Sequence, residues 1–352
     1  MTVRVESVAN QVCGSIDVRP YLMYPEDLWA NGGDGEGITV AIVDTGFNLD
    51  DELKQVWAGG INLVPGEKKN NLTDYCNHGT MVAKQIHAFA PKAMIYGIKV
   101  FGDQPFTDDA LAAEGIALAA EKGDLANASL GGDTDTAEMR SAVAEFEKRN
   151  KTLVVSAGND GDADVETTEI SYPSGYDWPV VVGAWDRTVW ADPTFWQIPE
   201  QPARYSSSSP YVDCVALGRI PGYWMDGTSF AGPAVAGLLA CWQSFCLKTG
   251  RPADDDSNWA FLLSHTRQLP GYPAKNNQTG YGVLTMRPWH EFRMLEINAR
   301  TLEGWLNGKP VAWKEKPFNK NGHLMLWIRE FADMMGLPTE WDAEKMISRW
   351  WH

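Results

Sequence analysis

The sequence lacks the features that mark secreted, membrane-spanning and nucleic-acid-binding proteins. Residues Met1–Ser7 contain no apolar run of signal-peptide length, and no later segment consists of about eighteen uncharged apolar residues. Basic residues are also scarce, because 30 Lys and Arg stand against 46 Asp and Glu, which gives a net charge of −16. Such a charge disfavours nucleic acid and anionic membranes as partners. We expect neither nucleic-acid binding nor membrane insertion.

Cysteine is also sparse, and its pattern excludes two common kinds of stabilisation. The chain has five cysteines, an odd number at irregular spacing, which favours neither a disulfide framework nor a zinc site. They are Cys13, Cys76, Cys214, Cys241 and Cys246. Reduced thiols are typical of the cytoplasm, which is the predicted location. The alternative is a secreted protein, if the chain is a mature fragment of a longer precursor.

Short apolar runs alternate with helical patterns along most of the chain. The predicted strands are Gly37–Asp44, Ile95–Val100, Leu125–Leu130, Leu153–Ala157, Val180–Gly183 and Gly280–Leu284. The predicted helices include 108–122 and 137–149, and the second of these places Met139, Val143 and Phe146 on one face. This alternation predicts an α/β fold with a doubly wound, mainly parallel sheet covered by helices on both faces. Sites in such folds gather at the carboxyl ends of strands.

Four polar residues stand out, although each has an ordinary structural interpretation. Asp44 follows a strand as a turn former would, and His78 lies in a loop pattern. Asn159 fits a tight turn, and Ser229 fits a helix N-cap. Together they supply a nucleophile, a base, a carboxylate that orients the base, and an amide for an oxyanion. This combination favours acyl transfer at a serine.

The nucleophile candidate lies among small residues in the stretch Gly227–Gly237, which contains a proline. Small neighbours would let a peptide carbonyl approach Ser229. Because the first turn of a helix has no internal partners for its N–H groups, we expect Pro233 to fall in that turn.

The motifs VAIVDTG, NHGTMVA, ASLGG, VVSAGND and DGTSFAGPAVAG, in the order Asp, His, Ser, resemble those of the subtilisin-like serine proteases. These form the subtilase or peptidase S8 family, and the intracellular subtilisins are the most similar in organisation. The resemblance implies a serine endopeptidase that acts on polypeptides through an acyl-enzyme on Ser229. His78 would be the general base and acid, Asp44 would orient it, and Asn159 would belong to the oxyanion hole.

Two other interpretations were weighed. The first is a catalytically silent protein with the subtilase fold that serves in binding or as a scaffold. The second takes Asp44-Thr-Gly46 as an aspartic protease motif, but that chemistry needs two equivalent carboxylates and no second Asp-Thr-Gly occurs.

The same resemblance identifies the residues that would bind substrate and makes a cofactor unnecessary. An edge strand would pair with extended substrate, and a second wall would complete the pocket. These residues are Ser129, Leu130, Gly131 and Gly132 for the strand, and Ala157 and Gly158 for the wall. Met81 and Lys84 replace a histidine and a glycine of the family, which affects packing. The short stretch His87–Pro91 lies where many relatives bind calcium, so we expect that calcium site to be absent.

The segment that resembles the floor of the specificity pocket is acidic. It contains Asp160, Asp162, Asp164, Glu166 and Glu169. If one carboxylate points inward, a basic residue before the cleaved bond would be favoured. The alternative is a solvated acidic loop.

We predict three parts in the chain: residues 1–20, 21–289 and 290–352. The first part contains Arg19-Pro20 followed by Tyr21 and resembles the segment that covers the cleft in intracellular subtilisins; a surface tail is the alternative. The last part resembles the stalk domain at the amino end of copper amine oxidases, but its histidine spacing predicts no copper site. An accessory domain that binds a protein partner is therefore expected, and a homo-oligomer is left open.

Overall fold

The computed structural model describes residues 23–286, except 165–166, 187–200, 221–224, 270 and 273–274, together with short strands outside that range. The chain divides into two units, Met1–Met286 and Arg287–His352. This division lies close to the boundary predicted at residues 289–290. The motifs of the sequence analysis all belong to the first unit.

The first unit contains the helices and a large sheet. Its helices are α1 (Glu26–Trp29), α2 (Asp51–Gln55), α3 (His78–Phe89), α4 (Asp109–Lys122), α5 (Ala137–Arg149), α6 (Thr228–Thr249) and α7 (Asp255–His265). Its strands are β1 (Thr2–Arg4), β2 (Thr39–Asp44), β3 (Trp57–Asn62), β4 (Met94–Lys99), β5 (Phe106–Asp108), β6 (Leu125–Ala128), β7 (Thr152–Ser156), β8 (Val180–Asp186), β9 (Gln201–Pro202), β10 (Val212–Leu217), β11 (Thr266–Arg267) and β12 (Val283–Leu284).

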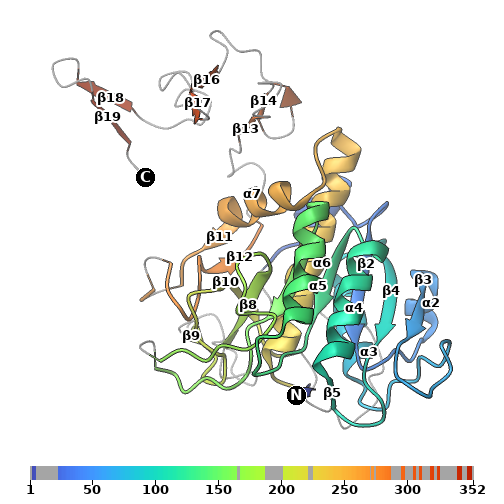
Figure 1. Cartoon of the computed structure of the whole chain (residues 1–352). Coiled ribbons are helices and arrows are strands. Elements are labelled where there is room, and N and C mark those ends of the chain that lie inside the picture. The colour runs from blue at the N-terminus through green and yellow to red at the C-terminus, as the bar shows by residue number, and fades with distance from the viewer. Residues whose placement is uncertain are drawn as a thin grey trace, which may run out of the picture. The chain divides into compact units, whose positions relative to one another are not determined.

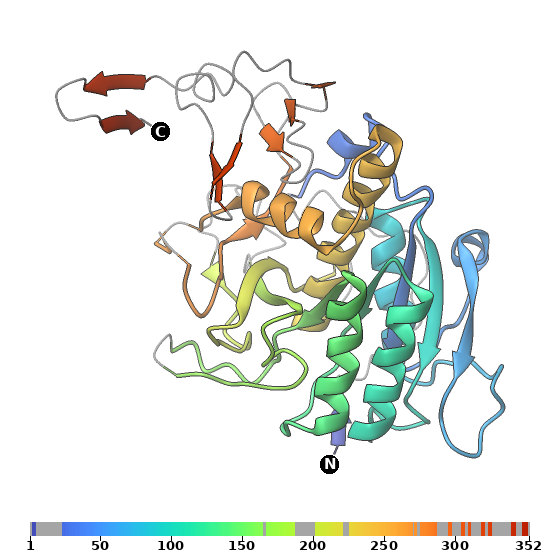
Figure 2. The ribbon, with the colours of Figure 1, turned by 45° about the horizontal axis from the view of Figure 1, so that its top comes forward.

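The large sheet has the strand order β11-β12-β10-β8-β7-β6-β2-β4-β3 (Figure 1). Neighbouring strands from β12 to β3 are parallel, whereas β11 and β9 pair antiparallel with β12 and β8. Helices cover both faces, and α4 and α5 lie side by side on one of them (Figures 1 and 2). The predicted doubly wound α/β fold is confirmed.

The alternation of side chains along β2 determines which face of the sheet holds the site. Ala41 and Val43 belong to the core cluster that also contains Ala112, Ile116 and Val143 of α4 and α5. Successive side chains of a strand point to opposite faces. Asp44, one residue beyond Val43, therefore points to the other face, where α3 and α6 pack together.

Helix α6 is the centre of that second face. Among the described residues it is the only helix long and apolar enough to cross a membrane, with a mean hydropathy of 1.4 in its most apolar stretch. However, 94% of this stretch is buried inside the protein, as in a core helix. Pro233 is its sixth residue, so the expectation that this proline falls in the first turn is wrong.

The described residues of the second unit form short antiparallel strand pairs. The strands are β13 (Leu295–Ile297), β14 (Gly304–Leu306), β15 (Lys309–Pro310), β16 (Phe318–Lys320), β17 (His323–Met325), β18 (Thr339–Asp342) and β19 (Ile347–Trp350). The first three form one small sheet, and the others form two hairpins. The resemblance to a stalk domain and the expected protein partner stay predictions.

Strand β10 was not predicted, because Asp213 interrupts its apolar pattern. The Asp213 side chain is 6% exposed, and its Oδ2 accepts a hydrogen bond of 3.0 Å from the Val181 backbone N–H. Lys275 Nζ lies 3.6 Å from the other carboxylate oxygen. Burial penalises the charged form more than these partners favour it, and it raises the pKa of Asp213 to about 6.

The buried Asp213 predicts how stability depends on pH. Because its pKa is raised in the folded state, its protonation stabilises the protein below about pH 4, and this contribution is lost as the pH rises through 6. Asparagine at position 213 does not titrate, so Asp213→Asn does not lose this contribution. The free energy of unfolding of the variant minus that of the parent chain should therefore increase from pH 5 to pH 8. The increase over this window should be about 1.4 kcal/mol, because about one pKa unit of the shift lies above pH 5.

Denaturant unfolding at the two pH values measures this difference, with Ser229→Ala in every chain to exclude the self-digestion that the resemblance predicts. Asp124→Asn is the control, because it removes an exposed carboxylate that also accepts a backbone N–H, from Thr39. Equal changes for both variants would contradict the assignment.

Candidate active site

Asp44 ends the central strand β2, and its environment favours a buried charge. Its side chain is 0% exposed, and Oδ1 accepts a hydrogen bond of 2.7 Å from Thr45 N. Lys99 is its register partner on β4, and Lys99 Nζ donates to the Thr45 carbonyl at 2.6 Å. Burial lowers the pKa of Lys99, while the nearby carboxylates Glu67, Asp74 and Asp44 oppose this. A buried carboxylate needs donors and a neighbouring positive charge of this kind.

His78 is the first residue of α3, and its ring is held by Asp44. The two side chains are both 0% exposed, and His78 Nδ1 lies 2.7 Å from Asp44 Oδ1. This close approach requires Gly79, because a Cβ there would lie 2.4 Å from the Gly46 carbonyl and 2.9 Å from Asp44 Cβ. With its Nδ1–H donated to the carboxylate, the Nε2 edge is the one that can accept a proton.

Asp74 connects the end of β2 to the first turn of α3. Its Oδ1 accepts from Thr45 Oγ1 at 2.8 Å, and its Oδ2 accepts from Thr80 N at 2.8 Å and from Thr80 Oγ1 at 2.6 Å. Thr45 Oγ1 in turn accepts from Gly79 N at 3.0 Å. These bonds fix the two backbone segments that carry Asp44 and His78. The sequence analysis did not identify Asp74 or Thr45.

Ser229 is the second residue of α6, in the layer where α3 and α6 are in contact. The His78 ring lies 5.5 Å from the ring of Phe230, the residue next to Ser229. Gln85 of α3 donates a hydrogen bond to the Phe230 carbonyl. The predicted base and nucleophile therefore come from neighbouring helix starts, although 151 positions separate them in the sequence.

Asn159 lies beside Ser229 and is oriented by Thr228. Asn159 Oδ1 accepts from Thr228 N at 2.8 Å and from Thr228 Oγ1 at 3.0 Å, and Thr228 Oγ1 accepts from Gly158 N at 3.2 Å. Because its oxygen is held in this way, Asn159 directs its NH₂ group away from Thr228. Thr228 is a functional residue that the sequence analysis missed, although it lies inside the Gly-Thr-Ser motif.

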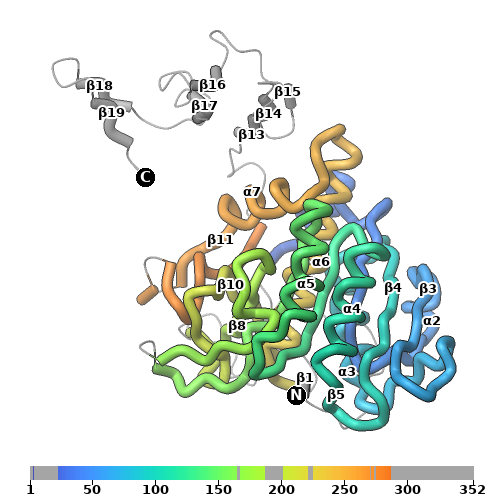
Figure 3. The backbone as a smooth tube through the Cα atoms, viewed as in Figure 1, coloured from blue at the N-terminus to red at the C-terminus, as the bar shows by residue number. Residues whose placement is uncertain are grey.

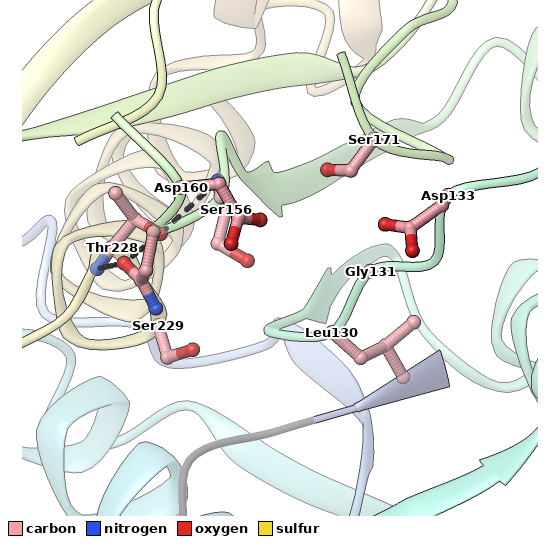
Figure 4. A pocket seen from close by; sticks show the side chains of 10 residues that line it. Leu130, Gly131, Asp133, Ser156, Asp160, Ser171, Thr228 and Ser229 are labelled. Atoms are coloured by element: carbon pink, nitrogen blue, oxygen red, sulfur yellow. Dashed lines mark hydrogen bonds between the residues drawn. The ribbon is translucent and has the colours of Figure 1, made fainter. Parts of the chain in front are cut away.

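A cavity of about 220 Å³ opens beside Ser229 (Figure 4). Its lining includes Leu130, Gly131, Asp133, Ser156, Gly158, Asn159, Asp160, Ser171, Thr228 and Ser229. Among the residues predicted to bind substrate, Leu130, Gly131 and Gly158 line it. Ser129, Gly132 and Ala157 lie next to these in the chain but are not part of the lining.

The geometry suits nucleophilic catalysis at a serine. The hydroxyl of Ser229 and the amide of Asn159 border a cavity that can hold a side chain, and the oriented imidazole of His78 lies at the start of the neighbouring helix α3. In the described part of the chain, no three His, Cys, Asp or Glu side chains are placed to hold a metal ion. The predicted absence of the family's calcium site stays a prediction.

The sequence profile described as "Subtilase family" matches residues 35–282. The chain belongs to the subtilase family. It is 32% identical over 241 residues to the "Major intracellular serine protease" of Bacillus subtilis (strain 168), which covers 62% of this chain and 72% of that protein. It is 34% identical over 274 residues to the "Intracellular serine protease" of Paenibacillus polymyxa, at 71% and 79% coverage. "Subtilisin Savinase" of Lederbergia lenta is 32% identical over 224 residues, at 58% and 76% coverage.

This subtilase is a serine endopeptidase, as its family and the named activity of these relatives establish. Its substrates are polypeptides. The alternative of a catalytically silent scaffold is not favoured.

Proposed function

We propose that Ser229 is the nucleophile, His78 the general base and acid, Asp44 the orienting carboxylate and Asn159 the oxyanion donor. The observation that carries this assignment is the bond between His78 Nδ1 and Asp44 Oδ1 inside the protein. It holds the imidazole in the tautomer whose Nε2 can accept the Ser229 proton. The N-terminus of α6 adds the partial positive charge of its helix dipole near Ser229.

The reaction then proceeds in two acyl-transfer steps. Ser229 Oγ attacks the peptide carbonyl while His78 accepts its proton, and Asn159 donates to the oxyanion. His78 next protonates the amine as it leaves, and the acyl-enzyme forms. Water then attacks the ester with His78 again as the base, which releases the acid and restores Ser229. No metal or cofactor takes part in this scheme.

We also propose that the enzyme acts in the cytoplasm. Two relatives are named as intracellular. The thiols of Cys76, Cys214 and Cys241 are free and buried, which suits a reducing compartment. Cys13 lies outside the described residues.

Active-site labelling tests the assignment. A fluorophosphonate probe should label the parent chain at Ser229, and Ser229→Ala should abolish both labelling and peptide hydrolysis. Asp44→Asn should lower kcat by about 10⁴-fold, because the carboxamide favours the wrong imidazole tautomer. Asn159→Ala should lower it about 100- to 1,000-fold, the range known from subtilisin itself for loss of one oxyanion donor.

Peptide mass mapping of the labelled protein identifies the modified residue. Ser244→Ala is the control, because Ser244 is equally buried and lies in the same helix away from the cavity. Labelling at another residue, or full activity of Ser229→Ala, would contradict the assignment.

The cavity beside Ser229 further supports a preference for a basic residue before the cleaved bond. Two carboxylates from separate segments line it, Asp133 and Asp160, and its lining contains no Lys, Arg or His (Figure 4). Two other acids of the predicted segment hold loop groups instead of lining the cavity. Asp162 accepts from Asp164 N and Thr167 Oγ1, and Glu169 accepts from Ser208 N; Glu166 lies outside the described residues.

Matched peptides with lysine or norleucine before the cleaved bond test this preference. We expect a higher kcat/KM for lysine, which Asp160→Asn and Asp133→Asn should each reduce about 1.5- to 5-fold, since exposed ion pairs contribute about 0.2–1 kcal/mol. The preference should weaken at high salt. Asp162→Asn is the control. A preference that is absent, or unchanged in the cavity variants, would remove the proposal.

We propose that the amino-terminal residues compete with substrate. Strand β1 pairs antiparallel with β5, with Val3 opposite Thr107 (Figure 3). Val3 is 0% exposed and belongs to the same core cluster as Leu130, which lines the cavity. A segment in this position occupies backbone groups that an extended peptide could use. The remaining residues of the predicted 1–20 segment, including Pro20, lie outside the described residues.

A shortened chain that starts at Met23 tests this competition. Its KM for a peptide of four or more residues should be several-fold lower than that of the full chain, with kcat unchanged. Val3→Asp in the full chain should act in the same direction, because it places a charge where the apolar side chain packs. Thr2→Ser is the control. Equal KM values for all four chains, with thermal unfolding confirming that each is folded, would discard the proposal.

A further inference from the structure

The backbone carbonyl of the nucleophile has lost its usual helical partner. In an α-helix, the carbonyl of residue i accepts from the N–H of residue i+4. Four residues after Ser229 comes Pro233, which lies within α6 and has no N–H. A proline ring also crowds the carbonyl of residue i−4. The Ser229 carbonyl, in the second residue of α6, therefore needs a hydrogen-bond donor from outside the helix.

Ser129, the residue that follows strand β6, supplies that donor. Ser129 Oγ donates to the Ser229 carbonyl at 2.9 Å, and Asn127 Nδ2 donates to Ser129 Oγ at 2.9 Å. Ser129 and Asn127 are both 0% exposed. A hydroxyl has one proton, so the bond from Asn127 occupies its acceptor side and fixes the direction of that proton. Asn127, Ser129 and Ser229 form a continuous chain of bonds, here called the serine relay.

Two further contacts show that the serine relay is fitted closely to the nucleophile. Ser229 Oγ lies 3.4 Å from the Ser129 carbonyl, its acceptor. A Cβ at Gly232 would lie 3.3 Å from Asn127 Oδ1 and 3.9 Å from Ser129 Oγ. Glycine at 232 therefore makes room for the relay beside the first turn of α6. Both the backbone carbonyl and the hydroxyl of Ser229 therefore contact Ser129.

We propose that Asn127 and Ser129 are positioning residues for the nucleophile. They replace the hydrogen bond that Pro233 removes, and so hold the Ser229 backbone in place at the start of α6, beside the cavity that Asn159 also lines. This role differs from the substrate binding predicted for Ser129, because its side chain serves the enzyme's own helix. The inference rests on the proposed role of Ser229.

Ser129→Ala removes the donor and leaves the backbone carbonyl in place. We expect kcat to fall about 10- to 100-fold with KM changed less than about 3-fold, since a small displacement of a reacting group costs rate rather than binding. The fluorophosphonate labelling rate, which needs no peptide binding, should fall by the same factor. Ser129→Cys keeps a weak donor and should be intermediate.

Ser244→Ala is the matched control for a purely structural role. Ser244 is 0% exposed, lies in the same helix, and its Oγ donates to the Glu36 carbonyl at 2.8 Å. Its removal should lower the unfolding temperature about as much as Ser129→Ala does, but leave kcat and labelling unchanged. Equal kinetic effects of the two variants would overturn the proposal.

The combination with Pro233→Ala gives the sharpest test. Alanine at 233 returns an N–H four residues after Ser229, so Ser129→Ala should cost less than about 3-fold in kcat in that background. An equal cost in both backgrounds would overturn the proposal. If Ser129→Ala does not fold, Asn127→Ala is compared in the same two backgrounds. A parent chain that is not labelled at Ser229 would instead refute the proposed function.

Discussion

The proposed catalytic arrangement depends on one buried hydrogen bond, from His78 to Asp44. An imidazole can serve as a base toward a serine only while its other nitrogen is held, and the carboxylate that holds it must stay charged inside the protein. Burying that charge is costly. The surroundings reduce the cost through the Thr45 N–H, the neighbouring Lys99 and the bonds from Asp74 that tie both segments together. Much of the local sequence serves this one contact.

The surroundings of Ser229 follow a different principle. A residue that disfavours a helix lies within α6, and contacts from neighbouring elements compensate for it. A proline within α6 is unfavourable for the helix by itself. The Ser129 hydroxyl, Gln85 and the small residue Gly232 bring neighbouring elements against the first turns of α6. Departures from local preference are expected at functional sites, where tertiary contacts compensate for them.

The sheet brings these two halves together. Asp44 and the end of β6 lie at the same edge of parallel strands, where the carboxyl ends meet. Because side chains along β2 alternate between the two faces of the sheet, Asp44 points toward α3 and α6 rather than toward α4 and α5. The same edge carries Leu130 and Gly131 into the cavity, so chemistry and substrate binding share one face of the fold.

The sequence by itself determined the fold class, because alternating apolar runs and helical patterns are local signals, and helix 137–149 was predicted with its observed bounds. It also indicated Asp44, His78, Asn159 and Ser229, since these residue types in this order suit only a few kinds of chemistry. Only the tertiary structure showed that Thr228 orients Asn159, that Asp160 rather than Asp162 lines the cavity, and that the Ser129 hydroxyl donates to the Ser229 carbonyl. These contacts join residues 69 to 100 positions apart, and the direction of a side chain at such separations depends on how strands and helices pack, which no local pattern encodes.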